Sequence, residues 1–196
     1  FKPLSEPSRQ SKKDIFNKTA TNNIENDIHI DFFPEGGSLL QNVASVVALK
    51  TTDSFGNPIE VRGEVFDEEG ELISLFLSLH DGMGMFQIMP IKGKKYHAKI
   101  KTASGIEIIK NLPEALEQGY LIVFKSFKGQ RIVSIKTNQE TLSKNPNELL
   151  TVICKSKGIS YLETTQTLTN TAVSFALPES NLPEGISQIT LFDGNL

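Results

Sequence analysis

Three histidines, His29, His80 and His97, carry the side chains best suited to acid–base or metal chemistry near neutral pH. None has a second histidine or a carboxylate at the close spacing of a known metal-ligand motif, although Asp31 and Asp81 are near neighbours. The His80–Asp81 pair could contribute to a metal site, but such pairs also serve turns. We therefore predict no metal-binding, cofactor-binding or catalytic residues in this chain.

The strongest local signal is the run Asp81-Gly82-Met83-Gly84. An aspartate can accept a hydrogen bond from the backbone two residues on, and glycine adopts positive φ without steric cost. A phosphate-binding loop would need a helix after the glycines, whereas a strand pattern follows here. The run therefore predicts a tight β-turn.

Acidic residues gather in the predicted turns and are the candidates for a calcium site. Calcium needs about six to eight oxygen ligands from converging loops. The sequence has no Asp-x-Asp-x-Asp pattern, so ordinary turn hydrogen bonding is the favoured interpretation. The residues concerned are Asp53, Asp67, Glu68, Glu69 and Asp81.

The single cysteine, Cys154, lies in the apolar run Leu149–Cys154. One cysteine cannot form a disulfide within the chain or a four-cysteine zinc site. We predict that it is buried as a small hydrophobic side chain, which makes it a poor nucleophile. No serine lies in a Gly-x-Ser-x-Gly elbow either. These patterns predict a protein that is not an enzyme.

Charge excludes one class of partner. The 20 basic residues are scattered among 23 acidic ones, with a net charge of −3, which predicts no nucleic-acid surface. The densest basic run, Lys92–Lys95, lies beside a turn and is expected to be a solvated loop. No stretch approaches the roughly 20 apolar residues of a membrane span, so we expect no direct membrane insertion. The start does not resemble a signal peptide, and we expect a piece of a longer protein.

Short alternating runs dominate the chain from Ile28 onward. Ile28, Ile30 and Phe32 alternate with polar or less apolar neighbours, which indicates a strand with one buried face. Turn signals recur every 8 to 12 residues, the rhythm of immunoglobulin-like sandwiches. We predict an all-β fold. The expected strands are residues 28–33, 43–50, 59–67, 71–78, 86–90, 96–101, 106–109, 120–126, 131–136, 149–155, 159–166, 171–177 and 187–192.

The segment Leu112–Gly119 interrupts this rhythm, and its proline, acids and terminal glycine predict one helical turn or a short loop. We place a domain boundary there. Residues 1–26 are expected to be a linker or the tail of a preceding module, residues 27–110 a first sandwich and residues 111–196 a second. The best helical candidate is Glu140–Leu150, which Pro146 interrupts.

Several motifs together resemble the macroglobulin-like β-sandwich domains of large cell-envelope proteins of Bacteroidota. Some of those proteins carry carboxypeptidase-regulatory-like domains or plug domains of TonB-dependent receptors. The motifs cover most of residues 28 to 193 and comprise residues 31–39, 43–50, 56–63, 78–86 and 182–193.

The resemblance implies two tandem macroglobulin-like sandwiches, the second without its last strand. It also implies a non-catalytic spacer and protein-binding segment of a periplasmic or outer-membrane-associated protein, whose partners are neighbouring domains or another envelope protein. The family has no catalytic residues to carry over, and the thioester motif of true macroglobulins is absent around Cys154. A carbohydrate- or ligand-binding module of a nutrient-uptake system is the alternative, which the absence of tryptophan weakens.

Overall fold

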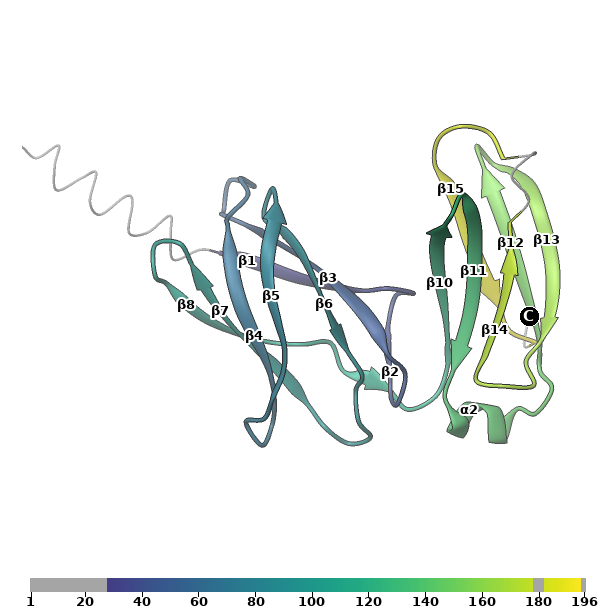
Figure 1. The fold of residues 1–196 in the computed structure, drawn as a ribbon, viewed down its shortest axis with the longest axis horizontal. Coiled ribbons are helices and arrows are strands. Elements are labelled where there is room, and N and C mark those ends of the chain that lie inside the picture. Colours follow the sequence, from purple (N-terminus) through teal and green to yellow (C-terminus); the bar gives the residue numbers. More distant parts are fainter. Residues whose placement is uncertain (1–27, 178–181, 195–196) are drawn as a thin grey trace, which may run out of the picture.

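The computed structural model describes residues 28–177 and 182–194 of the chain. Its strands form two β-sandwiches that follow one another in the sequence (Figure 1). The all-β prediction of two tandem antiparallel sandwiches is confirmed. The expected linker at residues 1–26 lies outside the described residues, and the proposed division near residue 111 stays a prediction.

The first sandwich has the seven-strand order β1-β3-β6-β5-β4-β7-β8. Its two layers are continuous through β5, which pairs with β4 along most of its length and with β6 only at Ser78 and His80. The strands are β1 (His29–Pro34), β3 (Ser45–Thr52), β6 (Met83–Ile88), β5 (Leu72–His80), β4 (Val61–Asp67), β7 (Tyr96–Thr102) and β8 (Glu107–Asn111).

The apolar residues that alternate with polar ones along these strands form the core of this sandwich. Every second residue of β3, β4 and β7 is buried, because successive side chains of a strand point to opposite faces. Between the layers, the rings of Phe76 and Phe86 stack with centroids 5.4 Å apart. Gly63 faces Phe76 across the β4–β5 pair, and a Cβ at this position would clash with the Phe76 ring.

The second sandwich consists of two three-stranded sheets, β10-β11-β14 and β13-β12-β15. Its buried core is Ile135, Leu150, Val152 and Leu168. The strands are β10 (Tyr120–Phe127), β11 (Gln130–Thr137), β14 (Ala172–Ala176), β13 (Ile159–Thr167), β12 (Leu149–Ser156) and β15 (Ser187–Phe192).

The order β13-β12-β15 of the second sandwich corresponds to β5-β4-β7 of the first. Strand β15 therefore occupies the position that β7 has in the first sandwich. Strand β7 lies between β4 and β8, and its inward residues are buried. Within the described ranges, β15 pairs only with β12, and none of its residues is fully buried. The expected absence of a last strand in the second sandwich stays a prediction.

The segment Leu112–Gly119 is a short loop, one of the two alternatives that the sequence predicted, except for two residues in its middle. It contains β9 (Ala115–Leu116), which pairs in parallel with β2 (Leu39–Leu40), a strand that the sequence did not signal. Both β2 leucines are fully buried, so their distant tertiary contacts override the local turn signals of the segment. A two-residue strand is also too short to show any alternation.

The predicted helix over Glu140–Leu150 is shorter and begins earlier. The helix α2 (Gln139–Lys144) starts after the N-cap Asn138 and ends at Asn145, directly before Pro146. Proline disfavours the helical conformation of the residue before it, which explains this end. Leu149 and Leu150 belong to β12 instead. Within the described residues, no helix has the length and apolar character needed to cross a membrane.

Candidate functional site

The three histidines lie in three different parts of the first sandwich, and each has a different environment. His80 Nε2 is 3.0 Å from Asp81 Oδ2, and both side chains are largely exposed, at 79% and 62%. The ring of His97 stacks on Phe66 on the outside of the first sandwich, and His29 begins β1. Among the residues that the structure describes, no group of three or more His, Cys, Asp or Glu could hold a metal ion.

The Asp81–Gly82 run forms the tight turn that the sequence predicts. Both residues have positive φ, 48° and 69°, as the favoured two-residue hairpin turns require. The turn packs closely on β3, because the backbone N–H of Thr51 donates to the Gly82 carbonyl at 2.9 Å. A Cβ on Gly82 would clash with the Thr51 carbonyl oxygen, so glycine is required here for space as well as for conformation.

Asp53 caps the turn between β3 and β4. Its Oδ1 accepts hydrogen bonds from the backbone N–H groups of Phe55 and Asn57, at 2.9 and 2.8 Å, and its Oδ2 accepts from the Asn57 side chain at 2.9 Å. These bonds, that from the Asn57 side chain foremost, lower the pKa of Asp53. Asp53 lies in the turn before β4, whereas Asp67 ends that strand, and the two belong to no group of three or more possible metal ligands among the described residues.

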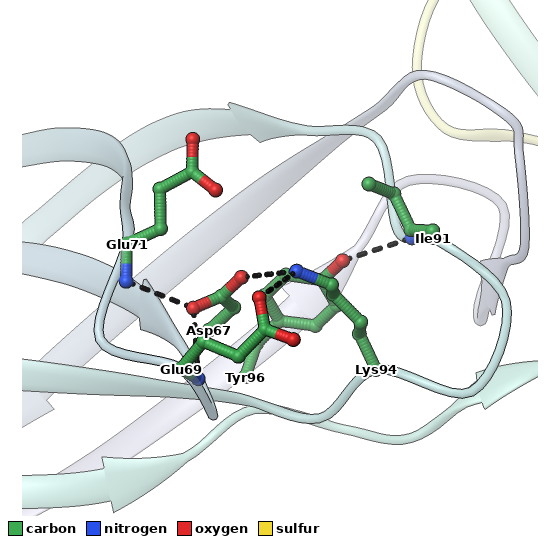
Figure 2. Close-up of polar contacts among 6 residues, drawn as sticks. All are labelled: Asp67, Glu69, Glu71, Ile91, Lys94 and Tyr96. Carbon is green, nitrogen blue, oxygen red and sulfur yellow. Dashed lines mark hydrogen bonds and ion pairs between the residues drawn. The ribbon is translucent and has the colours of Figure 1, made fainter.

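Asp67 is the centre of a polar cluster of the first sandwich (Figure 2). Its side chain is fully shielded from solvent, and its Oδ2 is 2.6 Å from Lys94 Nζ. Its Oδ1 accepts the backbone N–H groups of Glu69 and Glu71 at 3.0 and 2.9 Å. Lys94 also contacts Glu69 Oε2 at 2.8 Å. The cluster closes the β4–β5 hairpin against the loop before β7.

The loop that carries Lys94 is itself held in place. The Tyr96 hydroxyl accepts the Ile91 backbone N–H at 2.8 Å (Figure 2). The Lys94 backbone N–H donates to the Ile91 carbonyl at 3.1 Å. The prediction of a solvated basic run is therefore wrong for Lys94, which is 22% exposed and paired. It is right for Lys92 and Lys95, which are exposed.

Hydrogen bonding and charge act on Asp67 in the same direction. The Lys94 ammonium first, and then the Glu71 N–H, hold the pKa of Asp67 below its ordinary value. The hydrogen bonds that Lys94 donates to Asp67 first, and then to Glu69, raise the pKa of Lys94. Both carboxylate oxygens of Asp67 accept hydrogen bonds from groups of this chain. The cluster therefore connects two loops and is not a binding site for a ligand.

Cys154 is buried in β12, as predicted. Burial raises the pKa of its thiol, so little thiolate forms near neutral pH. Cys154 lies opposite Leu162 of β13 on one side and opposite Ile189 of β15 on the other. These neighbours support a packing role.

A concave surface on the outside of the first sandwich was not foreseen from the sequence. It encloses about 870 Å³ over β5, β4, β7 and β8. Lys101 pairs with Glu107 at 2.9 Å. The side chains of Arg62 and Glu64, on β4, have no hydrogen-bond or ion-pair partner within the described part of the chain. Leu75 and Leu77 form one margin of this groove and Ile109 the other.

The junction between the sandwiches is the second feature that the sequence did not reveal. The Asn138 side-chain amide donates to the carbonyls of Gln41 and Glu117, at 3.0 and 2.7 Å. Its oxygen accepts the Thr141 backbone N–H at 3.0 Å and so caps α2. Asn138 and Gln41 are 97 residues apart, and no local pattern signals such a contact.

Apolar contact accompanies these hydrogen bonds. Leu40 and Val43 of the first sandwich form a buried cluster with Leu121 of β10. Gly36, at the turn after β1, lies against the backbone of Ile122, and a Cβ there would come within 3.0 Å of the Ile122 carbonyl oxygen. The two sandwiches therefore meet through a packed interface, which β9 and α2 flank.

No family model and no curated protein matches this sequence. Three solved structures that resemble the chain do so at low identity. The adhesin FdeC of Escherichia coli aligns with 65% of this chain and 46% of its own, at 12% identity and a TM-score of 0.29. The BSP domain of a biofilm-associated protein aligns with 84% of this chain and 29% of its own, at 11% identity and a TM-score of 0.34.

The native form of the alpha-2-macroglobulin of E. coli aligns with 84% of this chain and 14% of its own, at 11% identity and a TM-score of 0.32. The chain thus spans less than half the length of each of these proteins. All three are distant matches to bacterial β-domains. No role is carried over from them.

Proposed function

We propose that this chain is a non-catalytic spacer and interaction segment of a larger extracytoplasmic protein, at the cell surface or in the periplasm. Its work is to hold neighbouring domains of the same polypeptide at a fixed spacing and orientation. The macroglobulin-like motifs of the sequence are consistent with such a protein. The observation that carries the proposal is the packed junction between the two sandwiches.

The junction has the features of a stiff connection. Gly/Ser-rich linkers behave as random coils and leave the orientation of their domains free. Here the connecting segment contributes β9 to a parallel pair with β2, and the Gln41 N–H donates to the Leu116 carbonyl at 3.0 Å. Asn138 adds two hydrogen bonds, and Leu40, Val43 and Leu121 exclude water. Bending the junction would break these contacts together.

Distances between spin labels test this stiffness. Lys110→Cys on β8 and Thr165→Cys on β13 are exposed positions, one on each sandwich, and Cys154→Ala removes the native thiol. We expect one narrow distance distribution from double electron–electron resonance. A broad distribution in this labelled protein would contradict the spacer proposal.

A matched pair of insertions identifies the junction as the cause. Five Gly/Ser residues inserted after Gln118 should broaden the distribution, because they separate β9 from β10. The same insertion between Lys128 and Gly129, in the exposed β10–β11 hairpin turn, should leave it narrow. Equal broadening by both insertions would mean that the junction does not set the orientation.

A ligand-binding module is the second candidate, and the groove over β5, β4, β7 and β8 favours it. Its unpaired Arg62 and Glu64 are groups that a polar ligand could engage. A glycan array probed with the wild-type chain and with Arg62→Ala separates the two proposals. Binding that is lost in the variant supports a ligand site, whereas no binding by either protein contradicts it.

A further inference from the structure

The groove over β5, β4, β7 and β8 has charged side chains along its middle and apolar ones at its margins. Arg62 of β4 lies opposite Leu77 of β5 on one side and opposite Lys101 of β7 on the other. Residues opposite each other in a ladder point to the same face of the sheet, and all three line the groove. Two cations therefore lie side by side on the middle strands.

The position of Arg62 leaves its charge without compensation. Like charges on directly opposite residues destabilise an antiparallel pair, and Arg62 lies opposite Lys101. Lys101 is paired with Glu107, on the strand at its other side. The exposed Arg62 side chain has no partner within the described part of the chain. A carboxylate between Arg62 and Lys101 would offset the repulsion, and it matches the fork of the guanidinium.

Glu64 limits how much negative charge the groove accepts. It lies opposite Lys99, whose Nζ is over the Phe66 ring, 4.5 Å from the centroid. Three basic and two acidic side chains line the groove, a net charge of +1, whereas the whole chain has a net charge of −3. The groove therefore suits a single carboxylate and not a run of them.

The margins of the groove are aliphatic. Leu75 and Leu77 of β5 are 63% and 55% exposed, and Ile109 of β8 is 68% exposed. The aromatic side chain of the lining, Phe76, is buried, so the groove offers no flat aromatic surface on which a sugar ring could stack. Aliphatic margins instead suit apolar side chains of a bound peptide.

We propose that this groove binds an extended peptide segment of a partner protein, of the type Leu-x-Asp-x-Leu. The aspartate contacts Arg62 and Lys101, and the two leucines contact Leu77 and Ile109. Strands β5 and β8 lie three strand spacings apart, about 14 Å, and residues four apart in an extended peptide are about 13 Å apart and face the same side. The proposal rests on the protein-interaction part of the proposed function.

NMR titration of the ¹⁵N-labelled chain tests the site. The probe is the peptide Ser-Leu-Ser-Asp-Ser-Leu-Ser, blocked at both ends so that the aspartate is its one charge. We expect the amides of the groove strands to shift, with a dissociation constant of about 0.1 to 1 mM. The same peptide with Lys for Asp, or with Ser for both Leu, should bind about tenfold more weakly or less. Groove amides that do not shift, or equal binding of all three peptides, overturn the proposal.

Matched variants test the two parts of the groove separately. Arg62→Ala should weaken binding of the probe by about tenfold or more, whereas Arg131→Ala, at an exposed arginine of the second sandwich, should not. Leu77→Ser should weaken it by about fivefold, whereas Leu79→Ser should not. Leu79 is exposed on the same strand but does not line the groove. A loss in either control as large as in its groove variant overturns the assignment.

Trigalacturonic acid tests the other source of a carboxylate, a sugar acid. It should leave the groove amides unshifted, and its binding in place of the peptide would overturn the proposal in favour of a glycan site. Failure of peptide binding is distinguishable from failure of the spacer role, because the spin-label distances depend on the junction and not on the groove.

Discussion

Asp67 shows how a single buried carboxylate can hold two loops together. Its three side-chain hydrogen bonds join residues of the β4–β5 hairpin to Lys94, which lies 27 residues further along the chain. The sequence identified Asp67 as a turn acid, and the bonds to Glu69 and Glu71 confirm that role. Its pairing with Lys94 could not be predicted, because it depends on how β4 and β7 align in space.

We predict that Asp67→Asn lowers the thermal midpoint by several degrees at neutral pH. The pKa of Asp67 is lowered in the folded chain, so its stabilising contribution is present above its ordinary value of 3.8 and is lost as the pH falls through the lower folded-state value. Stability of the wild type should therefore decline over that acidic window more steeply than stability of the variant.

Thermal melts of both proteins between neutral and acidic pH measure this difference. Asp53→Asn is the comparison, since Asp53 is also a turn acid with a lowered pKa but has no ion-pair partner in the described residues. Parallel pH profiles for Asp67→Asn and the wild type would contradict the assigned role of the Lys94 pair.

Gly63 is a second residue whose identity follows from a distant contact. We predict that Gly63→Ala costs about 1 to 3 kcal/mol of unfolding free energy, because the added methyl overlaps the Phe76 ring. Denaturant unfolding measures the loss. Replacing Phe76 by Leu in the same chain should make the added cost of Gly63→Ala much smaller. Equal costs in both backgrounds would show that the ring is not the obstacle.

At the scale of elements, α2 is a six-residue helix whose N-cap, Asn138, also bonds to the first sandwich and to the connecting segment.

Turn signals and alternation predicted the long strands to within a few residues, since each strand has enough residues to show which face it buries. They failed at β2 and β9, because two residues are too few to show any alternation. They also placed the helix too late, because Asn138 was not recognised as its cap.

We predict that Asn138→Ala destabilises the chain by about 2 to 4 kcal/mol, since it removes a cap and leaves two buried carbonyls without donors. Asn138→Asp separates the two effects. The carboxylate can still accept the Thr141 N–H, but it cannot donate to Gln41 and Glu117. Chemical denaturation should find both variants less stable than wild type; a wild-type value for Asn138→Asp would limit the role of Asn138 to capping.

At the scale of the molecule, the two sandwiches share an apolar contact that belongs to neither core alone. Leu121 points away from the core of its own sandwich and packs on Leu40 and Val43. The tandem all-β architecture was predictable from strand rhythm. The contact between its halves was not, because it joins short loop segments whose partners lie far away in the sequence.

We predict that Leu121→Asp divides thermal unfolding into two calorimetric transitions. The buried carboxylate breaks the shared cluster, so the second sandwich should melt earlier while the first keeps its midpoint. The wild type should show one transition, since the interface couples the halves. Phe127→Asp is the control on the same strand, because Phe127 is already 61% exposed, and it should leave one transition. Two transitions in the wild type would contradict the coupling.

The parallel pair of β2 with β9 also orders events during synthesis. Strand β2 emerges from the ribosome early, but its partner β9 follows the last strand of the first sandwich. Long-range pairs of this kind form only after the intervening chain has been brought together. The first sandwich must therefore be complete before the surface on which β10 packs, formed by Leu40 and Val43 beside the β2–β9 pair, can form. We expect the second sandwich to be docked onto a finished neighbour, so assembly proceeds from the N-terminal half toward the C-terminal half.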